Sequence, residues 1–193
     1  MPPLQTNHPQ SVSVALVSDT HGVLHPEIEN LVRDCDIAIH AGDIFNGRIL
    51  DRLQPRSGRV IAVAGNNDHE GVWPAEQRER VRALPRVASL ELPGGIVKIE
   101  HGHEHDWKAP SHDDLRAAHP EARLVVYGHT HRKLIDDYRK PWIVNPGAAG
   151  ATRTHGGPSC MILRASPDHW RIESFRFDED TTRSNEKSAA SAA

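Results

Sequence analysis

Acidic, imidazole and amide side chains occur in short clusters along this chain. The clusters are Asp19-Thr20-His21, Gly42-Asp43, Gly65-Asn66-Asn67-Asp68, His101-Gly102-His103 and Gly128-His129-Thr130-His131. Nitrogen and oxygen ligands without a thiolate favour Mn, Fe, Zn or Ni over Ca. The clusters carry more ligands than one tetrahedral ion takes, so they predict two ions that share a carboxylate.

Each cluster has a plainer interpretation when it is taken alone. Asp-x-His is common in turns, and Gly-Asn-Asn-Asp is typical of a turn because Asn and Gly tolerate positive φ. His-x-His can be two exposed side chains. In extended backbone, side chains two residues apart project to the same side, so we expect each Asp-x-His or His-x-His pair to reach one site.

Short runs rich in Val and Ile come directly before the clusters, and this composition is typical of buried strands. Helical patterns lie between the early runs, at residues 26–34, 47–53 and 74–84. Strand, helix and strand at this spacing predict a largely parallel start to the sheet. Ligands bind beyond the carboxyl ends of strands in such sheets, so we expect the clusters to meet on one rim.

The later strand candidates are more closely spaced. They cover residues 87–92, 96–100, 134–138, 142–144, 160–164 and 170–177, and Pro93-Gly94-Gly95 predicts a hairpin turn. The pattern indicates a mixed α/β fold with two packed sheets and outer helices, in one domain at 11–177. Residues 178–193 lack aromatic and branched aliphatic side chains, so we expect a disordered tail there.

Composition excludes several classes of protein. The 193 residues are 37% hydrophobic and 25% charged, as in ordinary globular domains. No apolar run is long enough for a membrane span and the first residues do not resemble a secretory signal, so we expect a cytoplasmic protein without membrane contact. The net charge of -3 does not suggest nucleic-acid binding. Cys35 and Cys160 form no CxxC pair and are expected to be unpaired thiols.

The clusters together resemble the calcineurin-like metallophosphoesterases, whose pattern is D-x-H, G-D, G-N-x-[DE], H-G and G-H-x-H. All of these segments are present, and the resemblance extends over residues 12–164. The Asp19-Thr20-His21 start and Asn145-Pro146-Gly147 resemble the small bacterial and archaeal phosphodiesterase subfamily, whose fold the eukaryotic retromer subunit shares. The resemblance implies a four-layer αββα sandwich of two mixed β-sheets flanked by helices.

The resemblance also implies a set of metal ligands and a reaction. One ion would be held by Asp19, His21, Asp43 and His131, and the second by Asp43, Asn66, His101 and His129, with Asp43 as the bridge. His101 is preferred to His103 because it directly follows its strand. Manganese is expected, with Fe, Zn or Ni as alternatives. The implied activity is a phosphoesterase, preferably a phosphodiesterase, in which a metal-bridging hydroxide attacks a small phosphate ester in line, and Asp43 and Asn66 belong to the catalytic set.

One position departs from the family pattern. Many relatives carry a histidine where Asn67 stands, and that histidine protonates the leaving group, which an amide cannot do. His103 and Asp68 are the remaining candidates for the acid, with His103 as the preferred substitute. Loss of the acid predicts a preference for diesters or good leaving groups.

Other functions and residues stay open at this point. A non-enzymatic metal-binding scaffold would predict replaced ligands, while a nucleotide pyrophosphatase would keep them; the oligomeric state is also open. The chain has no GxGxxG or GxxxxGK[ST] motif. His40 is expected to pack beneath a site, and His155 to be solvated. Arg153 could meet a phosphate or lie in an exposed turn, and Trp73 and Trp107 could wall a pocket, although core packing is the default for tryptophan.

Overall fold

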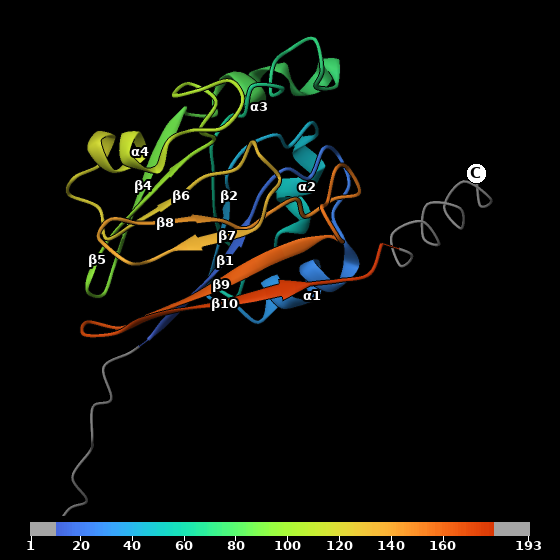
Figure 1. Cartoon of the computed structure of the whole chain (residues 1–193). Helices are drawn as coiled ribbons and strands as arrows, with labels where there is room; N and C mark the ends of the chain where they lie inside the picture. Colours follow the sequence, from blue (N-terminus) through green and yellow to red (C-terminus); the bar gives the residue numbers. More distant parts are fainter. Residues whose placement is uncertain (1–10, 180–193) are drawn as a thin grey trace, which may run out of the picture.

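Two five-stranded sheets lie face to face in the computed structural model, which describes residues 11–179 (Figure 1). The strand order is β10-β9-β1-β2-β3 in the first sheet and β4-β5-β6-β8-β7 in the second. The first sheet holds β1 (Val12–Val17), β2 (Ile37–His40), β3 (Arg59–Ala62), β9 (Ser159–Ala165) and β10 (Trp170–Arg176). The second holds β4 (Val87–Leu92), β5 (Gly95–Glu100), β6 (Leu124–Val126), β7 (Leu134–Asp136) and β8 (Trp142–Asn145).

The first sheet begins with parallel strands, as the alternation of strand and helix predicts. β1 pairs with β2 and β2 with β3 in parallel, while β9 and β10 close the other side antiparallel. Helices α1 (Pro26–Arg33) and α2 (Gly47–Arg52) form the crossovers, and they begin at His25 and Asn46, whose side chains accept from a backbone N–H of the first turn. The helical pattern at 74–84 forms a short 3-10 turn, η1 (Ala75–Gln77), followed by α3 (Arg78–Arg82).

The second sheet combines a hairpin with a parallel centre. β4 and β5 pair antiparallel with Leu92 opposite Gly95, so the predicted turn is confirmed. β5, β6 and β8 run parallel, and helix α4 (His112–Ala118) connects β5 to β6. The sequence did not predict α4, because Leu115 is its one buried apolar residue and the helix therefore lacks an apolar periodicity.

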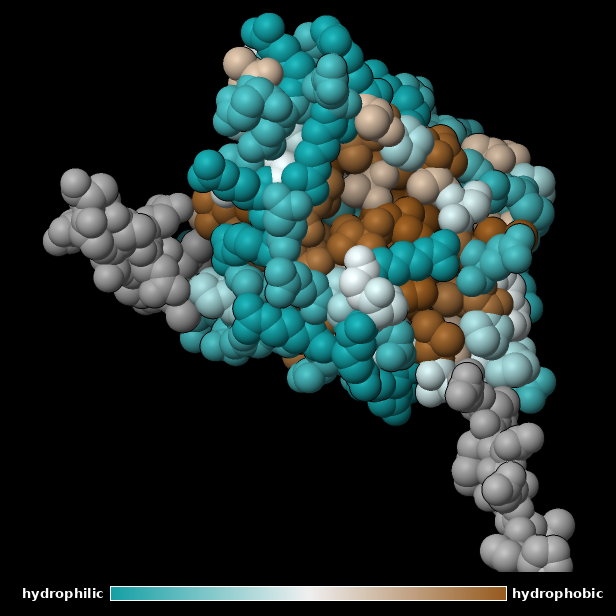
Figure 2. Space-filling view, turned by 180° about the vertical axis from the view of Figure 1, so that it is seen from behind, coloured by the Kyte–Doolittle hydropathy of each residue, from teal (hydrophilic) through white to brown (hydrophobic). Residues whose placement is uncertain are grey.

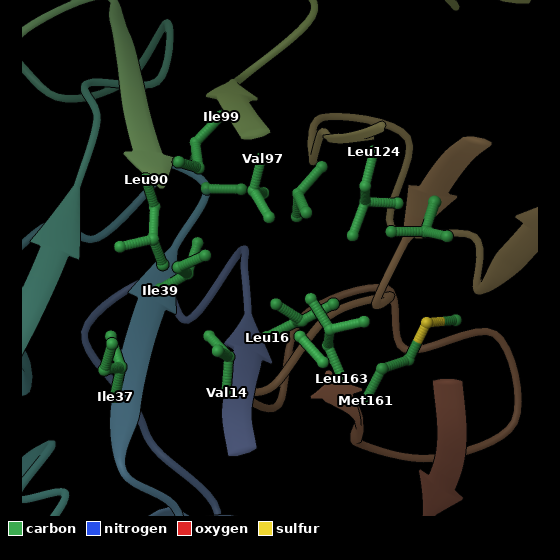
Figure 3. Packing of buried hydrophobic residues seen from close by; sticks show 14 of the residues in the cluster. Val14, Leu16, Ile37, Ile39, Leu90, Val97, Ile99, Leu124, Met161 and Leu163 are labelled. Carbon is green, nitrogen blue, oxygen red and sulfur yellow. The ribbon is translucent and has the colours of Figure 1, made fainter. Parts of the chain in front are cut away.

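The main core lies between the two sheets (Figure 3). Leu16 and Ile39 point from the first sheet toward Leu90, Ile99 and Leu124 of the second, and all of them are almost completely buried. Burying a large aliphatic side chain stabilises the fold by roughly 1.5–3 kcal/mol, so this layer sets how the strand ends of the two sheets face each other.

Two further apolar clusters attach the helices. Ile28 of α1 and Ile49 of α2 pack on the outer face of the first sheet, and Leu115 of α4 packs on Val125 and Ile143 of the second. The order of layers is therefore helix, sheet, sheet, helix, which confirms the predicted αββα sandwich. On the back face, apolar residues reach the surface at the centre of a hydrophilic surround (Figure 2).

Several smaller predictions have an outcome in the described residues. Cys35 and Cys160 are free and buried, and burial raises the pKa of their thiols to about 11 and about 12. Among residues 11–179, no helix has the length and hydropathy that a membrane span requires. Most of the tail predicted at 178–193 falls outside the described residues; the carbonyl of Asp178 lies 3.3 Å from the His25 ring, and Glu179 accepts from Thr154.

Candidate metal centre

The clusters lie in the loops that follow β1, β2, β3, β5 and β6. Backbone hydrogen bonds join the first two loops, since the N–H of Asp19 donates to Gly42 and that of His21 donates to Asp43, both at 3.0 Å. The N–H of Gly128 donates across to the carbonyl of His101 at 3.3 Å. The structure therefore brings the chemically active side chains of both sheets together on one rim.

Four of the predicted ligands form a compact group. Asp19, His21, Asp43 and His131 each offer a ligand atom within 4.8 Å of all the others. His131 Nε2 lies 3.2 Å from Asp19 Oδ1 and 3.0 Å from His21 Nε2. Two carboxylates and two imidazoles at this spacing suit one divalent transition-metal ion.

The remaining predicted ligands lie on the other side of Asp43. His101 Nε2 is 3.5 Å from Asp43 Oδ1, while His21 Nε2 is 3.7 Å from Asp43 Oδ2. His129 Nδ1 lies 3.0 Å from Asn66 Oδ1. The two oxygens of Asp43 thus face different imidazoles, which is the arrangement that a bridging carboxylate needs.

Backbone carbonyls orient three of the imidazoles. His101 Nδ1 donates to Ala41 at 2.7 Å, His131 Nδ1 donates to Thr152 at 2.8 Å, and His129 Nε2 donates to Trp107 at 2.7 Å. Each donation leaves the lone pair of the other ring nitrogen turned toward the site, as in second-shell contacts of metal-bound histidines.

Two of these ring nitrogens, on His101 and His129, face acceptors, and this tests whether the residues fit a metal. His101 Nε2 is buried without a hydrogen-bond partner, and His129 Nδ1 faces the carbonyl oxygen of Asn66. Buried acceptors that face each other repel unless a proton or a metal cation lies between them. The donor set is therefore suited to divalent ions on both sides of Asp43.

The backbone of the ligands differs from the sequence expectation. We expected extended backbone at the Asp-x-His and His-x-His pairs, and this was wrong, because strand pairing ends before them. The left-handed ligands, with their φ values, are Asp19 (52°), His21 (47°), Asp43 (55°), His129 (67°) and His131 (58°). Such backbone costs about 1–3 kcal/mol per residue and is concentrated at functional sites.

The charges around the site favour a cation. Burial would raise the pKa of Asp43, but its interaction with His101 and the hydrogen bonds from Asn67 outweigh burial and hold it below its usual range. Burial would lower the pKa of His101, yet Asp43 and Asp19 raise it to about 9. Buried carboxylates that stay ionised need positive partners, and two metal ions would supply that charge.

Glycines flank the clusters because side chains would occupy the space of the ligands. A Cβ at Gly65 would collide with the carboxylate and backbone of Asp43. A Cβ at Gly42 would lie 2.6 Å from His101 Nδ1, and one at Gly128 would lie 2.8 Å from Asp19 Oδ2.

The candidates for the proton donor are engaged in other contacts. Asp68 accepts from the N–H groups of Ile44, Phe45 and Gly65 and from the Trp73 indole, at 2.8–3.1 Å. It therefore braces the loop that carries Asp43.

The other two residues at this edge also have defined partners. Asn67 donates from its backbone and its amide to Asp43 at 3.0 and 2.8 Å, and thereby orients the carboxylate. His103 is half-buried, its ring centroid lies 5.4 Å from that of His101, and its Nε2 accepts from Arg86 at 3.1 Å.

Several residues outside the clusters support the centre. His40 is buried, its Nε2 lies 2.9 Å from Thr20 Oγ1, and burial lowers its pKa to about 4, so it packs beneath the site as expected. Asn145 donates to the carbonyl of Gly128 at 2.6 Å and holds the His129 loop. The sequence did not assign roles to Ser18, whose hydroxyl donates to Asp19 at 2.7 Å, or to the carbonyls that orient the histidines.

A pocket of about 630 Å³ opens over the centre. Asp43, Asn66 and His129 line its floor, and its walls include Trp107, Lys108, Arg132, Arg153 and His155. Trp73 is 3% exposed and belongs to the core, whereas Trp107 is 69% exposed and does not. The sequence analysis did not identify Lys108 and Arg132, and it did not place His155 at the site. No sequence motif predicts which exposed side chains of a loop face a site.

The sequence of this centre is shared with a known superfamily. Residues 12–168 match the calcineurin-like phosphoesterase superfamily domain. The chain belongs to that superfamily. Among curated members, a probable metallophosphoesterase of Methanocaldococcus jannaschii is 29% identical over 149 residues, which cover 72% of this chain and 69% of the relative. A phosphodiesterase of the same archaeon is 25% identical over 169 residues, covering 83% of this chain and 97% of the relative.

Solved structures share the fold of this calcineurin-like phosphoesterase. A single mutant of Vps29 from Entamoeba histolytica has a TM-score of 0.67 at 16% identity and covers 86% of this chain and 99% of that chain. A structure described as a novel archaeal phosphodiesterase has a TM-score of 0.62 at 22% identity, with 84% and 99% covered. Family membership confirms the prediction of a metallophosphoesterase, a hydrolase of phosphate esters.

Proposed function

We propose that this chain is a phosphodiesterase that works with two divalent metal ions. Asp19, His21, Asp43 and His131 hold one ion, and Asp43, Asn66, His101 and His129 hold the other. The observation that carries the proposal is the buried, unpartnered Nε2 of His101, which faces a carboxylate shared with the group around His131. A phosphodiesterase among the curated relatives supports the substrate class.

When bound, such ions lower the pKa of a water molecule and neutralise phosphoryl oxygens in an in-line displacement. Manganese is our first choice, with Fe, Zn or Ni as alternatives, because imidazole and carboxylate ligands are mixed. A Vps29 from Entamoeba histolytica, 15% identical with a TM-score of 0.61, has been solved in complex with Zn²⁺. That structure supports the capacity of this fold to hold a metal.

The chain's own residues hold the site in one geometry. Asp43 lies between the two groups of ligands, and the hydrogen bonds from Asn67 fix its carboxylate. Asp68 braces the Ile44 and Phe45 backbone immediately after Asp43. This preorganisation means that the ligands need little rearrangement as charge develops on the phosphoryl group.

We further propose that the leaving group departs without a strong side-chain acid. Asn67 cannot donate a proton, Asp68 is engaged by N–H donors, and His103 Nε2 accepts a hydrogen bond from Arg86. Phenolic and other acidic leaving groups need little protonation, whereas alkoxides need more. Diesters with good leaving groups are therefore the expected substrates.

The competing proposal is a metal-binding scaffold without activity, because Vps29 proteins share the fold. Asp43 and its neighbours at the centre keep residue types that bind metals, and the pocket leads to Asp43, which supports an enzyme. A nucleotide pyrophosphatase would use the same centre on a phosphoanhydride.

Metal analysis paired with activity assays tests the proposal. The 193-residue protein is loaded with Mn, Ni, Fe or Zn, and its metal content is measured. Hydrolysis of bis(p-nitrophenyl) phosphate is then compared with that of p-nitrophenyl phosphate. We expect two ions per chain and faster hydrolysis of the diester. Full occupancy without turnover on any metal would support the scaffold instead.

A further inference from the structure

The walls of the catalytic pocket carry an aromatic ring and several cations that the metal centre does not use. We propose that the substrate is a nucleotide phosphodiester whose base stacks on Trp107 and whose second phosphate is bound by Lys108 and Arg132. This inference rests on the proposed phosphodiesterase function and names the substrate class of the same site.

Trp107 is unusual for a tryptophan in its exposure and its position. Its side chain is 69% exposed, although tryptophan is on average highly buried. The indole lies edge-on to His129, with 5.9 Å between ring centroids, and the Trp107 carbonyl accepts from the same imidazole. The Trp107 ring therefore lies beside a proposed metal ligand, and it borders the place where the scissile phosphate would bind.

The loop that carries Trp107 is held at several points. Asp106 Oδ1 accepts from the N–H groups of Lys108 and Ala109 at 2.7 and 3.4 Å, which forms a turn around Trp107. Glu100 Oε1 lies 2.8 Å from His105 Nε2 at the start of the loop. These contacts fix the backbone on both sides of Trp107, so little backbone entropy remains to be lost when a base stacks on the indole.

The charge of the pocket exceeds what one diester requires. Two divalent ions, the carboxylates of Asp19 and Asp43, an attacking hydroxide and a diester monoanion together sum to zero. Lys108, Arg132 and Arg153 remain as additional positive charges, and within residues 11–179 none of their side chains lies within ion-pair distance of a carboxylate. These cations fit an additional anionic group on the substrate.

The cations divide into two positions. Arg153 donates to His131 Nε2 at 2.9 Å, so it lies beside the proposed ions and the scissile phosphate. Lys108 adjoins Trp107 in the chain, Arg132 follows His131, and both line the pocket. A second phosphate bound by Lys108 would lie near a base on Trp107, because the two residues are consecutive in the chain.

Size and net charge favour a small nucleotide over a polymer. The pocket of about 630 Å³ lies in the range of small-molecule sites, roughly 300–1,000 Å³, and greatly exceeds a single phosphate. Aromatic platforms combined with cations are typical of nucleotide stacking sites. The whole chain has a net charge of -3, which does not favour a long polyanion.

The proposed reaction is a simple hydrolysis. The oxygen of water forms a bond to phosphorus while the bond from phosphorus to the leaving oxygen breaks, and a proton of the water ends on that leaving oxygen. The products are a nucleotide phosphomonoester and an alcohol, and no oxidant or reductant takes part.

Inhibition by product-like compounds separates the base from the second phosphate. With the metal-loaded full chain hydrolysing bis(p-nitrophenyl) phosphate, we compare ribose 5-phosphate, AMP and adenosine 3′,5′-bisphosphate. We expect the inhibition constant to fall roughly tenfold when the base is added, since stacking on an aromatic side chain is worth about 1–3 kcal/mol. It should fall again, about severalfold and only at low salt, when the second phosphate is added.

Matched variants assign each of these two decreases in the inhibition constant to a residue. Trp107→Leu should remove the difference between ribose 5-phosphate and AMP, and Trp107→Phe should restore most of it. Arg132→Gln should remove only the effect of the second phosphate. Tyr138→Leu, at a 72% exposed aromatic outside the pocket, and Arg48→Gln, at an exposed cation on α2, serve as controls that should change neither step.

Trp107 fluorescence gives a readout that does not depend on turnover. Trp73 and Trp170 are 3% and 2% exposed, and the half-buried Trp142 does not line the pocket. Quenching by AMP should therefore come mainly from Trp107 and should disappear in Trp107→Leu. Equal inhibition by ribose 5-phosphate and AMP, or quenching that Trp107→Leu leaves unchanged, would overturn the proposal. If the wild-type protein hydrolyses no diester with any metal, the proposed function fails, while the fluorescence titration still tests nucleotide binding.

Discussion

The floor and the walls of the pocket differ in how tightly the fold holds them. Asp43 on the floor is 1% exposed, and the ligands beneath it, Asp19, His101 and His131, are 0–1% exposed. Each of these four has a hydrogen-bond partner that fixes its orientation. On the walls, Trp107 is 69% exposed, and Lys108 and Arg132 are also exposed. The comparison is consistent with our proposals that the buried ligands carry the chemistry and that the exposed wall residues bind the substrate.

Among the substitutions considered, loss of the Asp43 carboxylate should have the largest effect on metal binding and activity. Asp43→Asn takes away the charge that both groups of ligands share, so we expect loss of bound metal and a fall in kcat/KM of more than about 100-fold. Metal content and diester hydrolysis are measured together, with Asp114→Asn on the surface of α4 as the control. A variant that keeps both metal and activity would show that Asp43 does not bridge.

Filling the space beside Asp43 tests how tightly the floor is packed. Gly65→Ala places a Cβ against the Asp43 carboxylate, and overpacking of this kind costs about 1–3 kcal/mol. We expect a lower free energy of unfolding in urea and weaker metal binding. Gly71→Ala is the matched control, because its Cβ would meet only the flexible His69 ring at 3.2–3.3 Å. Equal effects of the two substitutions would contradict a tightly packed floor.

Asp68→Asn tests whether Asp68 only holds the Asp43 loop through hydrogen bonds or donates a proton to the leaving group. The amide keeps the shape but cannot accept as many N–H bonds, so we expect a loss of about 1–3 kcal/mol of stability and a fall in kcat. If Asp68 has only this structural role, kcat should fall by the same factor for phenolic and alkyl leaving groups. A selective loss on alkyl diesters would instead identify Asp68 as the proton donor. Asp137→Asn, at an exposed aspartate, is the control.

The pH dependence of stability should differ between metal-free and metal-loaded protein. The pKa of His101 is raised to about 9 against burial by Asp43 and Asp19, so its proton stabilises the metal-free fold. That stability is fully present below the unfolded pKa of about 6.5 and is lost as the pH rises through about 9.

Urea unfolding with a chelator, measured from pH 6 to pH 9.5, should therefore show a falling midpoint. With metal bound, neutral His101 is a ligand and this fall should disappear. His101→Gln should lack the same slope in the metal-free protein. If the midpoint of the metal-free wild type does not change with pH, the carboxylates of Asp43 and Asp19 do not raise the pKa of His101 as inferred.

A wall substitution should have the smallest effect. Arg153→Gln removes an exposed cation beside His131, so we expect KM for a diester to rise about fivefold at low salt with little change in kcat, since an exposed charge contact is worth about 1 kcal/mol. The rise should shrink at high salt, and Arg48→Gln should show none. A large loss of kcat with an unchanged KM would instead show that Arg153 acts in the catalytic step and not in substrate binding.

The architecture of the floor was largely predictable from the sequence. Val- and Ile-rich runs followed at once by Asp, His or Asn predicted strands with polar groups at their ends, and the parallel pairing of β1, β2 and β3 agrees with this. The prediction failed at α4 and at the backbone of the ligands. α4 has a single buried apolar residue, and left-handed backbone is uncommon for residues other than glycine, so no local pattern predicted it at the ligands.

The sequence by itself determined the types of ligand, their order and the likeness to metallophosphoesterases, because ligand chemistry and strand periodicity are local properties. Only the tertiary structure decided which ring nitrogens face the site, since backbone carbonyls from separate loops orient His101, His129 and His131. It also decided that Trp107 and Arg132 share a pocket with Asp43. Exposed side chains on loops carry no periodic signal, so their position depends on contacts between segments far apart in the chain.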